Sequence, residues 1–406
     1  MTSQNPSPNK EYPIREIFQD FLSESLKRYP ISVVQLKAAN NIINCKTGGK
    51  GYSVSFCEVC GIHETHACSC NDRNCPSCQV PQEKKWVLAR NSELIEGIAY
   101  YHLIFTMPHE LNDLIYTNQE LLYGLLFKCA SDTILTLCAD REHMGATPGI
   151  ISVLHTWGQQ MNYHPHLHLI ISGGGLTATG QFRETKRKGF FIPIGKVAKM
   201  FRGKYMATLK SLWNTNSLKF PLSMQKLENE SSWKNFINEL YSMKWLPFVK
   251  ETFNGNGNAI KYLGRYAFRT TISNHRIQSF EDGKVTFSYK DYKDGNKQKA
   301  KTVSCTEFIR LFLMHVLPKG FHRVRFSGFL TNSLKTKNLI QIHQLRETIY
   351  LGNPVKNLNT EELMVLLYNR NISDCSACNG RLIMIRLPRG EPLTSYKLND
   401  GIKKSA

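Results

Sequence analysis

Residues 164–168 read His-Pro-His-Leu-His and lead into an apolar run. This composition predicts a β-strand, on which residues two apart project from the same face. His166 and His168 would therefore direct two imidazoles toward one point, whereas Leu167 would face the other way. A single buried histidine is usually a hydrogen-bonded core residue, but two at this spacing among apolar residues favour metal binding. Because neutral imidazole is a common ligand of divalent metals, the strand predicts half of a metal site.

A third ligand is expected from a neighbouring strand. A hairpin centred near Gln160-Met161 would set His155 opposite His166, so that their side chains share a face. Gln159 and His164 are weaker alternatives. The site is expected to hold Mg²⁺ or Mn²⁺ and to polarise a phosphate as a Lewis acid, although by affinity alone histidines favour Zn²⁺. The two strands of this hairpin are expected over residues 149–157 and 165–172.

Two tyrosines lie four residues apart in a predicted helix over 258–270, which a glycine-rich turn at 254–258 would precede. At this spacing Tyr262 and Tyr266 share one helical face. An aromatic face packed in the core would give the same pattern, but the surrounding basic residues favour phosphate binding. These residues are Lys261, Arg265 and Arg269. With a free pKa of roughly 10, a phenol needs a base or a metal-polarised phosphate, and the histidines would supply the metal.

Seven of the 12 cysteines lie between Cys45 and Cys78. Two CxxC pairs in this segment can each give two thiolates to one tetrahedral Zn²⁺. The expected ligands are Cys57, Cys60, Cys75 and Cys78. A closed four-thiolate site leaves no position open for chemistry, which predicts a structural role.

Further thiols and imidazoles lie in or near the same segment. Cys45, His66 and Cys70 could complete a second site, replace one ligand or lie outside the first coordination shell, and the sequence leaves these alternatives open. Near the C-terminus, Cys375 and Cys378 form a third CxxC pair. With no second pair within reach in the sequence, this pair favours free thiols over a metal site.

The net charge is compatible with a basic protein that is kept soluble by its charge, but it favours a polyanion partner. Lys and Arg number 52 against 32 Asp and Glu, giving +20, which points to nucleic acid. No uninterrupted apolar run reaches the roughly 18 residues that span a bilayer, and the polar first ten residues lack a signal-peptide core. A cytoplasmic protein is therefore expected. Thiols stay reduced in that compartment, so the clustered cysteines favour metal binding over disulfides.

Strands and helices are interspersed through the central block, which predicts an α+β fold. Three domains are expected. Residues 1–95 would hold an N-terminal helix and the zinc-binding module, residues 96–275 the sheet with the candidate site, and residues 276–406 a basic C-terminal region. In the last of these, a hairpin at Asp282-Gly283 would precede a lysine-rich loop over 290–301.

The chain resembles the rolling-circle insertion-sequence transposases of the two-tyrosine HUH nuclease superfamily, over roughly residues 15–340. The resemblance rests on motifs that follow one another in the family's order. They are Cys57-x2-Cys60-Gly61, Asn71-Asp-Arg-Asn-Cys-Pro-Ser-Cys78, Phe105-Thr-Met-Pro-His109, His164-Pro-His-Leu-His168, Lys261-Tyr-Leu-Gly-Arg-Tyr266 with Ile272-Ser-Asn274, and Leu317-Pro-Lys-Gly-Phe321 followed by Arg323-Val-Arg325.

The resemblance implies an antiparallel central sheet flanked by helices, with the paired histidines on a central strand facing the tyrosine helix. It also implies that a tyrosine cuts single-stranded DNA at the element's ends, leaving a 5′-phosphotyrosine link and a free 3′-OH before joining to target DNA. Tyr262 and Tyr266 correspond to the nucleophiles, and His166 and His168 to the metal ligands. Arg323 and Arg325 are expected to contact DNA.

Two other functions are compatible with parts of this pattern. A plasmid replication initiator or relaxase would use the same chemistry, but the zinc module and the Lys-Tyr-Leu-Gly-Arg-Tyr context argue against it. A zinc-dependent DNA-binding repressor without catalysis would need none of the four site residues. These are all intact: His166, His168, Tyr262 and Tyr266.

Overall fold

The computed structural model describes residues 13–185, 192–245, 247–251, 256–292 and 294–387. The chain divides into two compact units, each built from separate stretches of sequence. Unit 1 comprises Met1–Lys85, Thr270–Val316 and Asn357–Ala406, and unit 2 comprises Trp86–Arg269 and Leu317–Lys356. The expected middle domain agrees with most of unit 2. The expected C-terminal domain over 276–406 is not a separate body, because its residues are shared between the two units.

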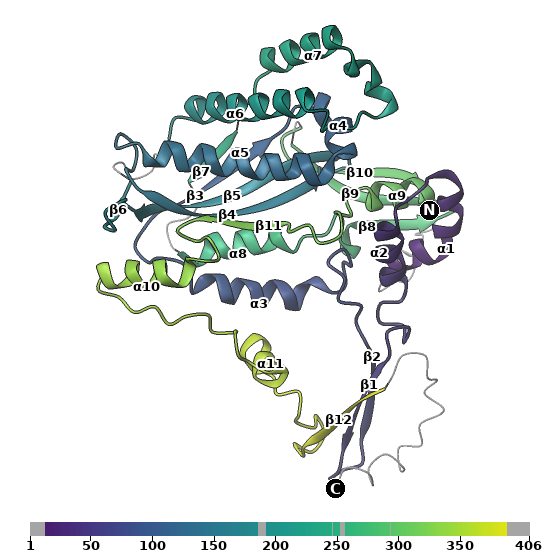
Figure 1. Cartoon of the computed structure of the whole chain (residues 1–406). Helices are drawn as coiled ribbons and strands as arrows, with labels where there is room; N and C mark the ends of the chain where they lie inside the picture. The colour runs from purple at the N-terminus through teal and green to yellow at the C-terminus, as the bar shows by residue number, and fades with distance from the viewer. Residues whose placement is uncertain (1–12, 186–191, 246, 252–255, 293, 388–406) are drawn as a thin grey trace. The chain divides into compact units, whose positions relative to one another are not determined.

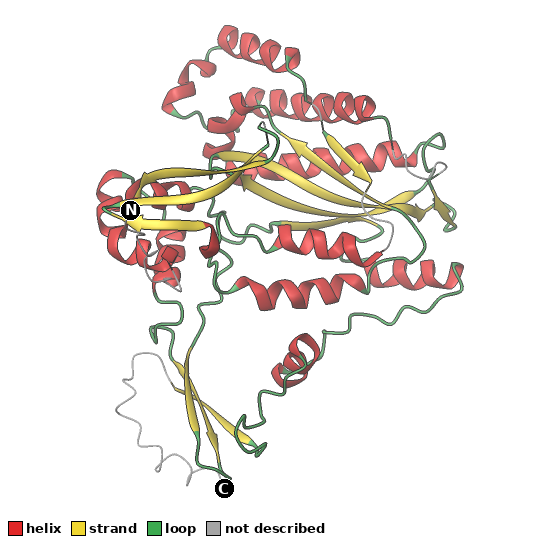
Figure 2. Cartoon of the chain, turned by 180° about the vertical axis from the view of Figure 1, so that it is seen from behind, coloured by secondary structure: helices red, strands yellow, loops and turns green. Residues whose placement is uncertain are grey.

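Unit 2 is built on one antiparallel sheet, whose strands are among the yellow arrows of Figure 2. The strand order is β11-β4-β5-β3-β7, and β6 pairs with β5. This sheet, flanked by helices, confirms the predicted α+β class. The strands are β3 (Tyr100–Thr106), β4 (Thr147–Trp157), β5 (Tyr163–Leu176), β6 (Phe182–Glu184), β7 (Phe248–Glu251) and β11 (Val324–Gly328).

The β4–β5 hairpin has the register expected from the sequence, with His155 opposite His166. The strand β5 continues to Leu176 instead of ending at the three glycines that follow Ser172. Close packing explains why glycine is used there. A Cβ atom on Gly175 would lie 2.3 Å from the carbonyl oxygen of Thr147, so glycine allows the neighbouring backbone to approach.

Helices cover both faces of this sheet, as Figure 1 shows. On one face, Leu154 and Leu167 belong to a large core with the long helices α5 and α6. On the other face, Val153 and Ile170 pack in a smaller core with α8 and α10. The helices of unit 2 are α4 (Asn112–Thr117), α5 (Gln119–Ala139), α6 (Ile194–Asn214), α7 (Glu230–Ser242), α8 (Asn256–Ala267) and α10 (Lys335–Leu345), with short 3-10 turns at His109–Leu111 and Leu222–Glu228. Residues 254 and 255 of the turn expected before α8 lie outside the described residues, and residues 256–258 already belong to the helix.

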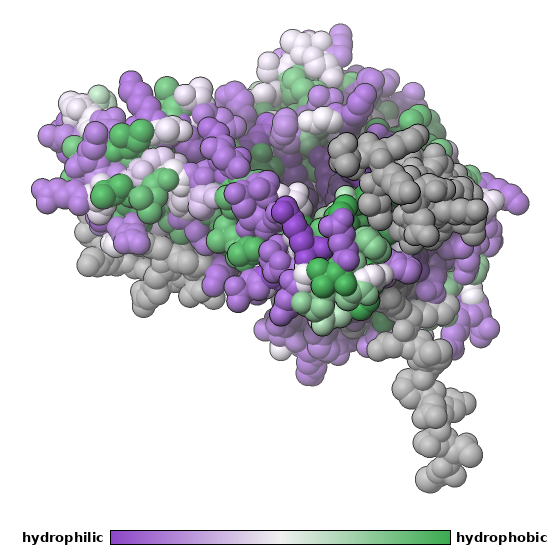
Figure 3. All heavy atoms as spheres, turned by 90° about the horizontal axis from the view of Figure 1, so that it is seen from below, coloured by the Kyte–Doolittle hydropathy of each residue, from purple (hydrophilic) through white to green (hydrophobic). Residues whose placement is uncertain are grey.

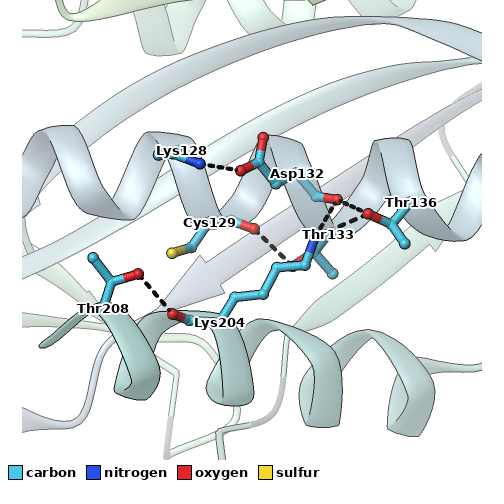
Figure 4. Close-up of polar contacts among 7 residues, drawn as sticks. All are labelled: Lys128, Cys129, Asp132, Thr133, Thr136, Lys204 and Thr208. Carbon is cyan, nitrogen blue, oxygen red and sulfur yellow. Dashed lines mark hydrogen bonds and ion pairs between the residues drawn. The ribbon is translucent and has the colours of Figure 1, made fainter. Parts of the chain in front are cut away.

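The helix α5 is long and apolar enough to cross a membrane, yet most of its apolar stretch is buried in the larger core. Within it, Lys128 and Asp132 form an ion pair at 2.6 Å. Lys204 of α6 donates from Nζ to the carbonyl oxygen of Asp132 and to Oγ1 of Thr136, both at 2.8 Å (Figure 4). These contacts fix α6 against α5, so α5 is a core helix of the fold.

Unit 1 contains two small three-stranded antiparallel sheets with orders β10-β9-β8 and β12-β1-β2. The lysine-rich segment 290–301 was expected to be a loop, but much of it belongs to the hairpin of β9 and β10. Lys297 and Lys299, for example, are residues of the strand β10. The elements are α1 (Pro13–Arg28), α2 (Val33–Ile43), β1 (Tyr52–Cys57), β2 (His63–Ala67), β8 (Ile277–Glu281), β9 (Lys284–Asp291), β10 (Lys297–Ser304), α9 (Cys305–Leu313), α11 (Thr360–Tyr368) and β12 (Leu382–Leu387), with a 3-10 turn at Asn274–Arg276. The helix α3 (Gln79–Asn91) crosses from unit 1 to unit 2.

Candidate active site

Three histidines converge on the α8 face of the unit-2 sheet. His155 comes from β4, and His166 and His168 come from β5. One nitrogen from each ring lies within 4.8 Å of the others, which is the spacing of a set of metal ligands. Side chains alternate between the two faces of a paired hairpin, and the register puts all three histidines on the same face. This is why they meet.

Hydrogen bonds fix which nitrogens of two rings face the centre. Nδ1 of His166 lies 2.7 Å from the carbonyl oxygen of His164 and donates to it, which leaves Nε2 with its lone pair. Nδ1 of His168 lies 3.0 Å from Nε2 of His102. Nε2 of His168 is buried and has no hydrogen-bond partner among the described residues. A buried polar atom without a partner is costly, and a metal ion at this point would satisfy it.

The environment keeps these imidazoles neutral. Burial lowers the pKa of His155 and His168 well below the ordinary value, and neighbouring histidines lower it further. Burial likewise lowers the pKa of His166 to about 4. The positive charge of Arg269 contributes in the same direction to all three. Neutral rings carry the lone pairs that a metal requires, so the donor set fits a divalent cation.

Tyr266 lies directly over the histidines. Its ring centroid is 4.1 Å from that of His168 and 5.3 Å from that of His155, and its side chain is half-buried. Nε2 of His155 also lies 2.7 Å from the backbone carbonyl oxygen of Tyr266. Tyr262 lies one turn earlier on α8, but its side chain is outside what the structure describes.

The predicted phosphate-binding residues fall into two groups. Lys261, Arg265 and Arg269 are exposed on or just after α8, and Arg269 acts electrostatically on the histidines. Arg323 lies on the same side of the sheet. Its guanidinium donates to the carbonyl oxygens of Arg269, at 3.1 Å, and of Ala267, so it caps the end of the tyrosine helix.

Arg325 lies on the opposite face of the sheet from the histidines, contrary to its expected grouping with Arg323. It is paired with Ser152 on β4, and its guanidinium stacks over Phe127, at 4.4 Å from the ring centroid, and over Phe321. Burial lowers the pKa of Arg325. Residues two apart on a strand share a face, but Arg323 precedes β11, which begins at Val324. The chain bends at Arg323, and its side chain points toward the end of α8.

His102 is a site residue that the sequence motifs did not single out. It is buried on β3, its ring stacks on that of His168 with centroids 5.3 Å apart, and its Nε2 lies 3.0 Å from Nδ1 of His168. The signal for it was present, since a histidine interrupts the otherwise apolar and aromatic run of residues 98–105. The β3–β5 register sets Ile104 opposite His168, so these two side chains share a face of the sheet. His102 lies two residues from Ile104 on the same strand and therefore faces the cluster as well.

The N-terminal cysteines do not form the single site expected from the sequence. Cys75 and Cys78 meet Cys45 and Cys70, not the other CxxC pair. Sγ of Cys78 lies 3.4 Å from Sγ of Cys45 and 3.6 Å from Sγ of Cys70. Two of the proposed additional ligands, Cys45 and Cys70, are therefore members of this cluster.

The first CxxC pair belongs to a different cluster. Cys57 and Cys60 meet Cys375 and Cys378, the C-terminal pair that the sequence left without a partner. Spacing along the chain suggested the wrong pairing because β12 brings a distant segment beside β1. His66 is in neither cluster and lies 3.3 Å from the carboxylate of Glu64.

Comparisons with known proteins identify the family. A family model described as "Transposase zinc-binding domain" matches residues 17–107, and one described as "Putative transposase" matches residues 149–338. The chain is 36% identical over 363 residues to "Putative transposase y4qJ" of Sinorhizobium fredii, covering 88% of this chain and 90% of that protein.

Two further similarities are more distant. The chain is 26% identical over 377 residues to the transposase for insertion sequence element IS801 of Pseudomonas savastanoi pv. phaseolicola, covering 90% of this chain and 87% of that one. The conjugative relaxase TrwC, solved in complex with oriT DNA, matches at 17% identity over 43% of this chain and 68% of its own, with a TM-score of 0.22. The chain therefore belongs to the insertion-sequence transposases of the IS91 and IS801 type, which confirms the resemblance drawn from its motifs, and it carries their N-terminal zinc-binding domain.

Proposed function

We propose that this transposase cleaves and rejoins single-stranded DNA through a 5′-phosphotyrosine intermediate at a divalent-metal site. His155, His166 and His168 would hold Mg²⁺ or Mn²⁺, and Tyr266 or Tyr262 would be the nucleophile. The observation that carries the proposal is the position of the Tyr266 ring, 4.1 Å from the ring of a histidine whose Nε2 is buried and unsatisfied. Nucleophile and metal ligands thus come from different elements and meet at one point.

The reaction exchanges one phosphodiester for another. The tyrosine Oη attacks the scissile phosphorus, an O–P bond forms, and the bond from phosphorus to the 3′ oxygen breaks. The phenolic proton passes to water and the departing 3′ oxygen takes one up. A bound divalent cation would supply Lewis-acid polarisation of the phosphate. Attack of a free 3′-OH on the phosphotyrosine reverses the exchange and joins the strands.

The protein's own residues perform the binding and positioning. The exposed side chains of Lys261 and Arg265 lie on the tyrosine helix, where they would hold the DNA backbone next to the cut. Arg269 lies close enough to affect all three histidines, so it would bind the phosphate beside them. Arg323 holds the end of the helix through two carbonyl groups. Lys261, Arg265 and Arg269 would contact the phosphate backbone of the DNA and not its bases.

The partners implied are single-stranded DNA at the element's ends and the target DNA, encountered in the cytoplasm. A net charge of +20 would give binding a strong electrostatic component. Raising the salt concentration should therefore weaken DNA binding steeply. The measurement is a fluorescence titration of a labelled oligonucleotide over a range of salt concentrations.

The decisive test is formation of a covalent adduct. Purified protein is incubated with Mn²⁺ or Mg²⁺ and with overlapping single-stranded oligonucleotides that together cover the DNA on both sides of its gene. Adducts are then separated under denaturing conditions. We expect one flank to give a metal-dependent adduct that maps to Tyr262 or Tyr266. The Tyr262→Phe/Tyr266→Phe double variant should give none while still binding DNA. An adduct of undiminished yield in that variant, or none with wild type on any oligonucleotide, would overturn the proposal.

A further inference from the structure

We propose that Cys57, Cys60, Cys375 and Cys378 bind a second zinc ion, which fastens the C-terminal strand β12 to the N-terminal hairpin of β1 and β2. We call these residues the clasp cluster. The matched zinc-binding domain ends at residue 107 and the second matched region at residue 338, so neither reaches Cys375 or Cys378. The proposal does not depend on the catalytic one, because it concerns thiols in unit 1.

The sulfur positions of the clasp cluster suit a tetrahedral zinc ion. Sγ of Cys57 lies 3.5 Å from Sγ of Cys378, and Sγ of Cys60 lies 3.6 Å from Sγ of Cys375. Four sulfurs at about 2.3 Å from a central zinc stand about 3.8 Å apart. A disulfide would need about 2.0 Å. The spacing thus matches thiolates around a shared ion.

The two CxxC segments also adopt the same turn, although they come from opposite ends of the chain. The N–H of Gly61 donates to the carbonyl of Cys57 at 2.9 Å, and the N–H of Asn379 donates to the carbonyl of Cys375 at 3.0 Å. Each first cysteine in turn donates its own N–H to the carbonyl five residues later, at 2.9 and 2.7 Å. Gly61 and Asn379 both have positive φ, 72° and 57°. A repeated turn that presents two thiols is the arrangement of paired zinc knuckles.

The eight clustered thiols divide into two complete sets of four. The other set, Cys45, Cys70, Cys75 and Cys78, is closed without any member of the clasp cluster. Cys68 lies between the two CxxC pairs in the sequence but belongs to neither set. Each set therefore satisfies one tetrahedral ion by itself, and the chain would bind two structural zinc ions.

The sheet that the clasp cluster joins has little else to hold it. The strand β2 is almost wholly exposed, and on β12 Met384 is 51% exposed. Close by, Val59 and Ile62 are 73% and 41% exposed. The described surface seen from below is mostly hydrophilic, with hydrophobic residues gathered in small groups (Figure 3). A sheet of three short strands with so small a core generally needs a metal or a disulfide for stability.

The first test uses the wild-type chain, so that no variant has to fold. Zinc-loaded protein and protein stripped with a chelator are treated briefly with a maleimide, and modified cysteines are identified by mass spectrometry. Cys60 and Cys378 are exposed and would react quickly as free thiols. We expect both to be protected in the zinc-loaded protein and to become reactive together after stripping. Rapid modification of either one in the zinc-loaded protein would overturn the proposal.

The second test counts zinc by elemental analysis and follows β12 by hydrogen exchange. The Cys375→Ser/Cys378→Ser variant should lose one zinc per chain and the protection of β12 amides. A matched variant of the other set, Cys70→Ser/Cys75→Ser, should lose one zinc and keep β12 protected, and Cys68→Ser should lose none. An unchanged zinc content in Cys375→Ser/Cys378→Ser would refute the proposal that the clasp cluster binds zinc. Because neither readout involves DNA, failure here is distinct from failure to form a DNA adduct.

Discussion

Nε2 of His155 lies 2.7 Å from the backbone carbonyl oxygen of Tyr266, which joins a candidate metal ligand on β4 to the helix that carries both candidate nucleophiles. A metal bound through Nδ1 of His155 would keep this bond, whereas one bound through Nε2 would replace it. In the structure the position of Tyr266 is set by this backbone contact as well as by the packing of its ring on His168. The site therefore positions the tyrosine before any DNA arrives.

His102 should act as a positioning residue for the metal. Its Nε2 is 3.0 Å from Nδ1 of His168, so it fixes the ring of that ligand. We expect His102→Ala to weaken Mn²⁺ binding by about 10- to 100-fold, the usual effect of removing such a partner. Saturating Mn²⁺ should restore most of the cleavage rate, and His102→Gln should bind Mn²⁺ better than His102→Ala.

Calorimetric titration of Mn²⁺ measures this effect directly. His164→Ala is a matched control, because the hydrogen bond to Nδ1 of His166 comes from the backbone carbonyl of His164, which the variant keeps. Equal Mn²⁺ affinity in His102→Ala and His164→Ala would contradict the assignment of His102.

Arg323 should matter for cleavage and Arg325 should not. Arg323→Ala removes the donors to the carbonyl oxygens at the end of α8. We expect a loss of about 1–3 kcal/mol in the free energy of unfolding and a larger relative loss in adduct formation than in DNA binding. Arg325→Met keeps the contact with Phe127 on the opposite face and should leave adduct formation unchanged. Equal losses of adduct in the two variants would be evidence against this division.

Acid should destabilise the metal-free protein through its histidines. The pKa values of His155, His166 and His168 are lowered in the folded state, to about 4 for His166, while in the unfolded chain they return to roughly 6.5. The unfolded state therefore binds more protons between these values, so stability is unaffected above pH 7 and falls as the pH drops below about 6.5. The urea midpoint, measured in chelator from pH 7.5 to pH 4.5, should decrease, and less so in His166→Gln. A midpoint that rises on acidification would contradict the neutral state of these rings.

A buried charged group in unit 2 should be a strong determinant of stability. Glu93 is 5% exposed and accepts from Arg90, at 2.9 Å, and from Lys335, at 3.1 Å. Glu93→Ala would leave two cations buried without their partner, which typically costs about 3–5 kcal/mol. The exposed pair of Glu230 and Lys234 is the control, and Glu230→Ala should change the free energy of unfolding far less, because solvent screens this pair. Urea unfolding of both variants tests this difference, and similar losses would refute it.

The meeting of the three histidines could be predicted from the sequence because its information is local. His155, His166 and His168 lie on one hairpin, whose register follows from the alternation of apolar side chains. The spacing of Tyr262 and Tyr266 defines a helical face in the same way. What could not be predicted, such as the contact of His102 with His168, depends on pairing between strands that are far apart in the sequence.

The cysteines show the same limit more clearly. Sequence spacing favoured joining Cys57 and Cys60 to the next CxxC pair, because a short connection costs less entropy to close. That cost grows only slowly with loop length, so a pairing over a much longer connection remained open to the fold. The antiparallel pairing of β12 with β1, which sets Cys57 opposite Leu382, decided the outcome. Nothing in the local pattern around Cys375 records that pairing.

The pairing of β12 with β1 has a consequence for the order of events during synthesis. Cys60 and Cys375 are 315 residues apart. At the usual rate of translation of about 5–20 residues per second, the N-terminal knuckle leaves the ribosome on the order of tens of seconds before its partner exists. During that interval the hairpin of β1 and β2 has an unpaired edge and two reactive thiols. A prematurely terminated chain would stay in this condition, which would distinguish it from the finished protein for cellular quality control.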